Sequence, residues 1–413
     1  MTRHTRRAAR LAFAPLLLSL LLTGTEARAA WRAAGDVMTV ARQADGVVLV
    51  LTSGARVAVT FRDIETVRVR LAPSGTFERD LSYAVEPKDR KTVAAKVTET
   101  SDEIRISSLD GTTVVVRRRP FAVSVLDESG RAVAEADPAK GTSFDPETGA
   151  VETSLKRVGW ETYYGLGEKA GATLSRDTQQ FVMWNTDTYG YPRGLDPIYQ
   201  SIGFYVALRH ERQELGGTRS EPTRPNVRRR GHAYGLFLDN TSRTYFDMGK
   251  TDPARVTFGA AGGELNYYVF TGGGERAPKQ IVRDYTGLTG RTPLPPLWAL
   301  GNQQSRWSYY PEARVREVAR GFRESRIPAD VIYLDIDYMD GFRVFTWNRE
   351  RFPDPSKMIA DLRAEGFRTV LIIDPGIKVD PNYFAYREGQ AGGHFVREAD
   401  GSELHATVWP GVC

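Results

Sequence analysis

The spacing of apolar residues along the chain changes at a proline-rich stretch, residues 291–296 (RTPLPP), and this change restricts the fold more than any other feature. Before it, from about residue 40, apolar and polar residues alternate with period two, as in Val57, Val59 and Phe61. After it, short apolar runs alternate with segments whose apolar residues recur at i, i+3, i+4 and i+7. The first pattern is typical of half-buried strands and the second of strands alternating with amphipathic helices. The sequence therefore predicts two domains of different class.

The first domain is expected to consist of stacked β-sheets. Ile104 and Ile106 lead to Asp110-Gly111, a strong hairpin signal, and further alternating apolar residues follow. Convincing helical patterns are few before residue 290. Many short strands separated by turns predict a sandwich of sheet on sheet.

The second domain is expected to contain a parallel sheet. Strands are predicted at residues 297–300, 331–334 and 370–373. The helix between the first two has Val315 and Ala319 on one face, and the next begins at Pro355, capped by Asp354. Three strand–helix units predict either a doubly wound sheet or a barrel, and periodicity does not choose between them.

Residues 1–29 have the three parts of a secretory signal: an arginine-rich opening, the apolar run 11–22, and the small-residue site Ala27-Arg28-Ala29. Cleavage is expected after Ala29, with export to the periplasm or the medium. The alternative, an uncleaved membrane anchor, is disfavoured because Pro15 interrupts an apolar run that is shorter than the ~20 residues that span a bilayer. We therefore expect no membrane association once the signal is removed.

Composition excludes several classes of function. Residues 1–29 hold five arginines and one acid, so they account for four of the chain's five net positive charges, and no nucleic-acid partner is expected. The single cysteine, Cys413, excludes a disulfide framework. No two histidines are spaced i and i+4, and no G-x-S-x-G occurs, so neither a zinc site nor a serine hydrolase is indicated.

Carboxylates follow two neighbouring predicted strands of the second domain. Asp335 and Asp337 come after the strand at 331–334, and Asp374 comes after the third strand. The carboxyl ends of parallel strands carry the active sites of barrels, and paired carboxylates can cleave glycosidic bonds. The aromatic residues near this cluster suit sugar rings, whose C–H faces stack on aromatic side chains; they are Trp307, Tyr338, Trp347 and Trp409. The alternative is that strand-end aspartates only cap turns.

Several blocks in the chain together resemble glycoside hydrolase family 31, and especially its α-glucosidases. They are 164–168 (YGLGE), 184–187 (WNTD), 295–301 (PPLWALG), 327–340 (IPADVIYLDIDYMD), 351–355 (RFPDP), 372–378 (IIDPGIK) and 408–411 (VWPG). The blocks follow the family's order from about residue 160 to the end.

The resemblance implies an N-terminal galactose-mutarotase-like β-sandwich over residues 30–290, followed by the first part of a (β/α)8 TIM barrel over residues 291–413. It also implies a retaining α-glucosidase that acts on terminal α-linked glucose in an oligosaccharide or α-glucoside, with neither a metal nor an organic cofactor. A family member specific for another sugar, such as xylose, is the variant of this interpretation.

Five substrate-binding residues follow from the resemblance. Asp335 would hold hydroxyl groups of the non-reducing sugar, Ile336 and Ile372 would line the pocket, Trp409 would wall it, and Asp187 would reach the aglycone side. The alternatives are that the isoleucines are ordinary core residues and that Asp187 caps a turn.

The chain departs from the family in its catalytic residues. The nucleophile motif W-x-D-M-N-E-P and the acid/base aspartate do not occur in it, and we expect both to lie beyond Cys413. The sequence thus predicts an N-terminal fragment of a longer enzyme, inactive alone. The alternative is a noncatalytic carbohydrate-binding protein derived from the family, although a barrel that stops after three strands leaves an unpaired sheet edge.

Overall fold

The computed structural model of the chain describes residues 31–86, 93–109, 111–158, 161–188, 190–210, 231–272, 277–408 and 410–413. The chain divides into two compact units, residues 1–291 and 292–413. The predicted signal segment and Trp409 lie outside the described residues. Among those residues, no helix is both long enough and apolar enough to cross a membrane.

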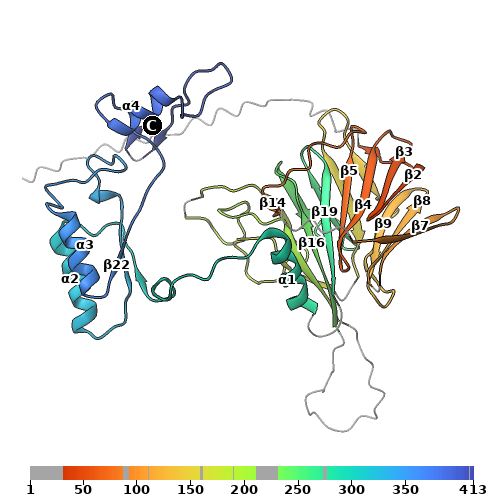
Figure 1. Cartoon of the computed structure of the whole chain (residues 1–413), viewed down its shortest axis with the longest axis horizontal. Helices are drawn as coiled ribbons and strands as arrows, with labels where there is room; N and C mark the ends of the chain where they lie inside the picture. The colour runs from red at the N-terminus through yellow and green to blue at the C-terminus, as the bar shows by residue number, and fades with distance from the viewer. Residues whose placement is uncertain are drawn as a thin grey trace, which may run out of the picture. The chain divides into compact units, whose positions relative to one another are not determined.

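The first unit is built from antiparallel sheets (Figure 1). The largest has the order β13 (Glu161–Gly165), β15 (Phe204–His210), β16 (Gly231–Leu238), β19 (Leu265–Gly272), β5 (Thr66–Ala72), β4 (Arg56–Asp63), β3 (Gly46–Leu51) and β2 (Val37–Gln43). The second has the order β1 (Arg32–Ala33), β11 (Thr142–Phe144), β12 (Val151–Lys156), β18 (Arg255–Ala260), β17 (Thr244–Asp247) and β14 (Gln180–Met183). The third has the order β10 (Ala132–Ala134), β9 (Phe121–Leu126), β8 (Thr113–Arg118), β7 (Glu103–Ser108) and β6 (Ala95–Glu99).

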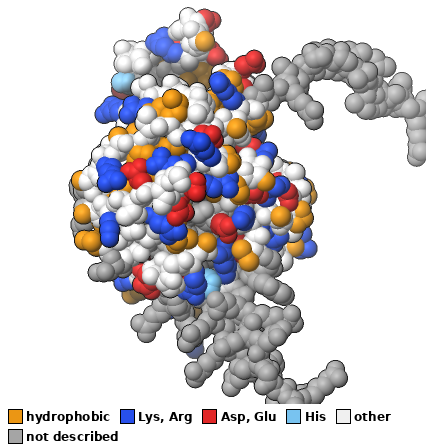
Figure 2. All heavy atoms as spheres, turned by 90° about the vertical axis from the view of Figure 1, so that its right-hand side faces the viewer, with side chains coloured by type: hydrophobic (Ala, Val, Ile, Leu, Met, Phe, Trp, Pro, Cys, Tyr) orange, Lys and Arg blue, Asp and Glu red, His pale blue; other side chains and the backbone are white. Residues whose placement is uncertain are grey.

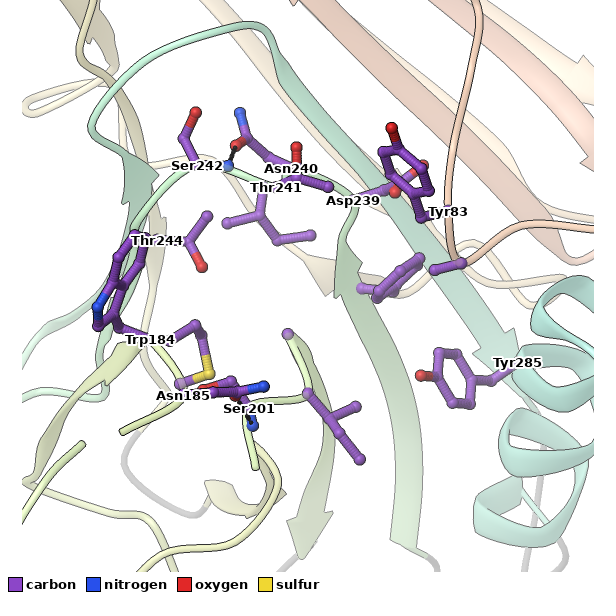
Figure 3. Close-up of a pocket in the computed structure, with 16 residues that line it drawn as sticks. Tyr83, Trp184, Asn185, Ser201, Asp239, Asn240, Thr241, Ser242, Thr244 and Tyr285 are labelled. Atoms are coloured by element: carbon purple, nitrogen blue, oxygen red, sulfur yellow. Dashed lines mark hydrogen bonds between the residues drawn. The ribbon is translucent and has the colours of Figure 1, made fainter. Parts of the chain in front are cut away.

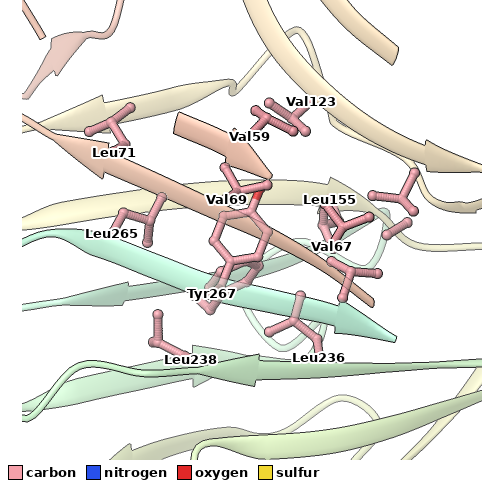
Figure 4. Packing of buried hydrophobic residues seen from close by; sticks show 14 of the residues in the cluster. Val59, Val67, Val69, Leu71, Val123, Leu155, Leu236, Leu238, Leu265 and Tyr267 are labelled. Carbon is pink, nitrogen blue, oxygen red and sulfur yellow. The ribbon is translucent and has the colours of Figure 1, made fainter. Parts of the chain in front are cut away.

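Alternate side chains of these strands form one hydrophobic core. Val57, Val59 and Phe61 of β4 are fully buried, as the period-two pattern predicted. Val59 pairs with Val69 of β5 in the antiparallel register. Figure 4 shows Val59 and Val69 together with Val123 of β9, which belongs to another sheet. The stacked-sheet architecture predicted for this part of the chain is thus confirmed.

Helix α1 (Ala277–Thr289) covers the other face of the largest sheet, and the sequence analysis did not predict it. Ile281 is buried against this face, where a Cβ on Gly235 would lie only 2.5 Å from the Cγ2 atom of Ile281. Tyr285 stacks on Phe204 with ring centroids 3.9 Å apart. A sheet with only one buried face would carry polar residues on its other face, but here α1 buries that face and aromatic residues occupy it. The alternation of apolar and polar residues is therefore lost in β16 and β19.

A buried ion pair anchors the segment that follows β14. The Lys169 side chain is 1% exposed, and its Nζ donates to Asp196 Oδ1 at 2.6 Å and to the Val182 carbonyl at 3.0 Å. Asp196 Oδ2 accepts the Val182 N–H at 2.6 Å. Burial lowers the pKa of Lys169. The pair ties Asp196 back to β14 and so restrains the intervening chain, which includes Asp187.

Positive and negative side chains are interspersed on the face of the molecule that Figure 2 presents, and apolar residues separate them. No large patch of a single charge is visible on that face.

The second unit contains a parallel sheet of β20 (Gln303–Gln304), β21 (Val331–Leu334) and β22 (Arg368–Leu371), with β21 in the middle. Its helices are α2 (Glu312–Glu324), α3 (Pro355–Ala364) and α4 (Phe384–Gly392), with short 3-10 helices η3 (Leu297–Leu300) and η4 (Ile336–Tyr338). A small hairpin of β23 (Thr407–Val408) and β24 (Gly411–Val412) completes the described elements.

The two predicted helices of this unit are confirmed. Val315 and Ala319 of α2 are fully buried, as the helical spacing required. Asp354 caps α3, because its side chain accepts the Lys357 N–H at 2.9 Å, and Pro355 is the first helical residue. A cap of this kind stabilises a helix by about 1 kcal/mol.

The prediction of a strand at residues 297–300 is wrong. The segment is the short helix η3, and Leu297 is 86% exposed. The strand lies three residues after it, where Gln303 pairs with Val331. An apolar run alone does not define a strand, because pairing with the neighbouring strand decides where the ladder begins. The third strand likewise begins at Arg368 and not at Val370, because Arg368 pairs with Val331.

Replacing Lys169 by methionine should leave the Asp196 carboxylate buried without its cation. We expect a loss of about 3–5 kcal/mol in the free energy of unfolding, the usual result of breaking a buried pair. The double variant Lys169→Met, Asp196→Asn should recover part of the loss, because it removes both charges. Urea unfolding followed by circular dichroism measures both; equal losses in single and double variants would contradict the role of the pair.

Limited proteolysis should cleave residues 292–413 before the sandwich. Both outer strands of the parallel sheet, β20 and β22, lack an outer partner strand among the described residues, and the side chains of β22 are only partly buried. Unpaired edges open more easily than the interior of a packed sandwich. Mass spectrometry of the resistant product should find a core within residues 31–291. Equal protection of both units would refute this.

Candidate active site

Asp335 and Asp374 follow neighbouring parallel strands. Asp335 comes directly after β21, and Asp374 comes three residues after the end of β22. Leu334 and Leu371, the last residues of these strands, are paired in register. The two carboxylates therefore leave the same edge of the sheet, the edge at which parallel α/β folds bind their ligands.

The Asp335 carboxylate is partly buried, and only one of its two oxygens caps the turn that follows the strand. Oδ1 accepts the Ile336 N–H at 2.7 Å and so caps η4. Within the described part of the chain, Oδ2 makes no hydrogen bond and no cation pairs with the group. The turn-capping alternative is thus correct for one oxygen, while the second remains available as an acceptor.

The Asp337 carboxylate forms an ion pair within the protein. Its Oδ1 lies 3.1 Å from Nη1 of Arg351, which also donates to the Asp337 carbonyl at 3.2 Å. The Arg351 guanidinium lies over the ring of Tyr310, 4.4 Å from its centroid. This network uses Asp337 to hold the segment near residue 351 and distinguishes it from Asp335.

The two isoleucines occupy different positions. Ile336 is buried in the hydrophobic core of the unit. Ile372 lies at the edge of that core, its N–H donates to the Leu334 carbonyl at 3.0 Å, and its carbonyl accepts the Tyr338 hydroxyl at 2.9 Å. Ile336 therefore has the core position that the alternative interpretation gave it, and pocket lining by either isoleucine stays a prediction.

Aromatic rings stand beside the carboxylates. Tyr338 packs on Trp347 with ring centroids 4.8 Å apart. Burial raises the pKa of Tyr338, and the negative charge of Asp374 raises it further, so the phenol stays protonated and remains a donor. Trp307 is 72% exposed, which leaves its indole free to contact a ligand.

Asp187 belongs to the first unit, in the segment that follows β14. Its side chain is exposed and forms no ion pair with another described residue. Burial and the charge of Asp187 raise the pKa of Tyr199, whose hydroxyl donates to the Thr188 carbonyl at 2.7 Å. Sequence patterns found Asp187 but not the Lys169–Asp196 anchor, because nothing in the pattern marks a lysine as buried.

Metal ligation has no support in the described part of the chain, where no three His, Cys, Asp or Glu side chains are grouped to hold an ion.

Two domain families match the chain. Residues 56–216 match the glycosyl hydrolase 31 N-terminal galactose mutarotase-like domain, and residues 292–413 match the glycosyl hydrolases family 31 TIM-barrel domain. The second match resolves the choice between a doubly wound sheet and a barrel.

Several proteins of similar sequence are α-glucosidases. The chain is 40% identical over 356 residues to alpha-glucosidase 2 of Bacillus thermoamyloliquefaciens, which covers 86% of this chain and 42% of the relative. It is 32% identical over 252 residues to an alpha-glucosidase of Saccharolobus solfataricus, covering 61% of this chain and 33% of the relative. The chain thus spans less than half the length of either protein.

Solved structures of the family have the same fold. A family 31 dextranase of Flavobacterium johnsoniae, solved with isomaltotriose, superposes with a TM-score of 0.80 at 28% identity, covering 92% of this chain and 44% of the other. Glucosidase II alpha subunit superposes with a TM-score of 0.72 at 23% identity over 93% of this chain and 48% of the other, a similarity of fold. With its N-terminal β-sandwich and the first strands of a TIM barrel, the chain belongs to glycoside hydrolase family 31.

Proposed function

We propose that the chain forms the sandwich and the first part of the barrel of an exported, retaining α-glucosidase that releases terminal α-linked glucose. The observation that carries the proposal is Asp335, a partly buried carboxylate at the end of the central strand with one oxygen unused by described residues. The names of the similar α-glucosidases and the isomaltotriose bound to the similar dextranase support the substrate class.

Asp335 binds the sugar at the non-reducing end through its hydroxyl groups. A hydrogen bond to a charged group contributes about 1.5–3 kcal/mol, roughly twice that of a neutral pair. The resemblance to the family assigns the lining of this sugar site to Ile336 and Ile372 and its wall to Trp409, and Trp307, which is 72% exposed, is available to stack on a ring. The aglycone-side role that the family resemblance assigns to Asp187 is part of the proposal, and its side chain is exposed on the segment that follows β14.

Bond cleavage with retention needs two carboxyl groups about 5–5.5 Å apart, one as nucleophile and one as acid/base. Asp337 does not meet this need, because Arg351 neutralises it. The motif W-x-D-M-N-E-P is absent from the 413 residues. We therefore assign substrate binding to this chain and assign both catalytic carboxylates to sequence outside it.

The 413-residue chain alone should not hydrolyse 4-nitrophenyl α-glucoside above background. Fusion to the portion of the Bacillus α-glucosidase that follows its matched region should restore turnover, with the α-anomer of glucose released first in NMR spectra. Turnover by the chain alone would show that Asp335 and Asp374 act as the catalytic pair. A fusion that folds and binds glucose without cleaving any α-glucoside or α-xyloside would favour the noncatalytic binding protein.

In the active fusion, Asp335→Asn keeps the shape of the side chain and removes its charge. Losing one or two charged hydrogen bonds in the transition state should lower kcat/KM by about ten- to a thousandfold, since ~1.4 kcal/mol corresponds to one decade. Asp400→Asn, in an exposed turn of the same unit, is the matched control and should leave kcat/KM unchanged. A purely structural Asp335 would instead lower the melting temperature while wild-type discrimination against deoxyglucosides is kept.

Export is part of the proposal, and residues 1–29 supply its support. N-terminal sequencing of the protein from a secreting bacterial host should give Ala30 as the first residue, because the small residues Ala27 and Ala29 fit the signal-peptidase site. Exported material that begins at Met1 would contradict this.

A further inference from the structure

A hollow of about 700 Å³ opens in the first unit, and none of its lining residues belongs to the second. Figure 3 shows side chains from four places in the sequence meeting around it: the segment after β14, the turn between β16 and β17, helix α1, and Tyr83. Its volume is within the roughly 300–1,000 Å³ of small-molecule sites. Asp335, Asp374 and Asp187 are not among its lining residues.

Aromatic side chains form part of the wall. Trp184 is 51% exposed and Tyr83 is 87% exposed, although both are large apolar side chains. Arg243, which does not line the hollow, lies 5.6 Å from the centroid of the Trp184 ring and restrains the indole by a cation–π contact. Tyr285 reaches the hollow from α1 and is held by its stacking on Phe204. The rings of Trp184 and Tyr285 are therefore preorganised at the site.

Polar groups with unused hydrogen-bonding capacity face the same space. Ser201 Oγ is shielded from solvent and has no partner among the described residues, which is costly for a hydroxyl unless a ligand or water satisfies it. Asn185 accepts the Ser201 N–H at 2.8 Å through Oδ1, and its amide hydrogens have no partner among the residues that the structure describes. The Thr244 hydroxyl likewise has no partner in the described part of the chain.

Two polar residues of the lining are already engaged within the protein. Asn240 Nδ2 donates to the carbonyls of Gly262 and Glu264, both at 2.9 Å. Asp239 accepts from Ser82 Oγ at 2.8 Å and from Asn266 Nδ2 at 3.2 Å. Both residues hold the turn in place and leave Ser201, Asn185 and Thr244 to meet a ligand.

The charge of the lining selects the class of ligand. No lysine, arginine or histidine lines the hollow, and Asp239 is its one ionisable acid, so an anionic ligand would find no counter-charge there. Rings on one side and neutral hydroxyl and amide groups on the other match a molecule with apolar faces and many hydroxyls. A neutral sugar has both.

We propose that this hollow is a second carbohydrate site, which binds glucosyl units of an α-glucan without cleaving them. Trp184 stacks on a sugar ring, while Ser201, Asn185 and Thr244 take its hydroxyls. The choice of an α-glucan rests on the proposed function, whereas the existence of a sugar site rests on the hollow alone. Such a site raises the local concentration of a polymeric substrate.

Titration of the purified 413-residue chain with maltotriose tests the site, by calorimetry and by tryptophan fluorescence. We expect saturable binding that Trp184→Ala weakens at least about tenfold, because stacking and apolar burial are both lost. Trp31→Ala is the matched control, since Trp31 is 41% exposed in the same unit and does not line the hollow. It should leave the affinity unchanged.

Two further variants make the outcome unambiguous. Thr244→Val keeps the shape of a strand residue and removes one hydroxyl, so it should weaken binding several-fold at an unchanged melting temperature. Asp400→Asn should leave the affinity unchanged, because Asp400 lies in an exposed turn and does not line the hollow.

Absence of saturable maltotriose binding would overturn the proposal. Binding that Asp335→Asn abolishes and both hollow variants retain would also overturn it and place the sugar in the barrel. Failure of the fusion to hydrolyse glucosides, with hollow binding intact, would refute only the proposed enzymatic function.

Discussion

The first unit depends on the register between its antiparallel strands. Val59 faces the core because it lies opposite Val69, and a slip of one residue would turn every apolar side chain of β4 to the other face. That register leaves the second face of the largest sheet to α1 and brings the turn after β16 close to the segment after β14. The hollow and the anchored segment that carries Asp187 both follow from it.

In the second unit, parallel pairing has the corresponding role. β21 pairs with β20 on one side and with β22 on the other, so Leu334 and Leu371 end together. The residues after each strand then share an edge although they are far apart in sequence. Helices α2 and α3 support this arrangement through buried side chains such as Val315 and Met358, which contact the core and not the edge. The residues that stabilise the unit thus lie in its core, and the carboxylates proposed to bind the ligand lie at the strand-end edge.

The sequence predicted those features that depend on local pattern or on strand order. Alternation located β4, helical spacing located α2, and the strand-end position of Asp335 located the candidate site. It did not predict features that depend on pairing or on long-range contacts. Leu297–Leu300 is apolar but lies outside the sheet. Lys169 is charged but buried, in an ion pair with Asp196. The hollow could not be predicted, because Tyr83, Trp184 and Tyr285 meet only after folding.

Asp335 and Asp337 are two residues apart, yet their environments differ. Asp337 has Arg351 as a counter-ion, so its burial is compensated within the protein. Asp335 is partly buried, and Oδ2 has no described partner, so one acceptor oxygen of the carboxylate is left for a ligand. A ligand hydroxyl that donates to Oδ2 would form a charge-assisted hydrogen bond without any rearrangement of the strand end. The asymmetry between these neighbours is the strongest physical reason to place the substrate at Asp335.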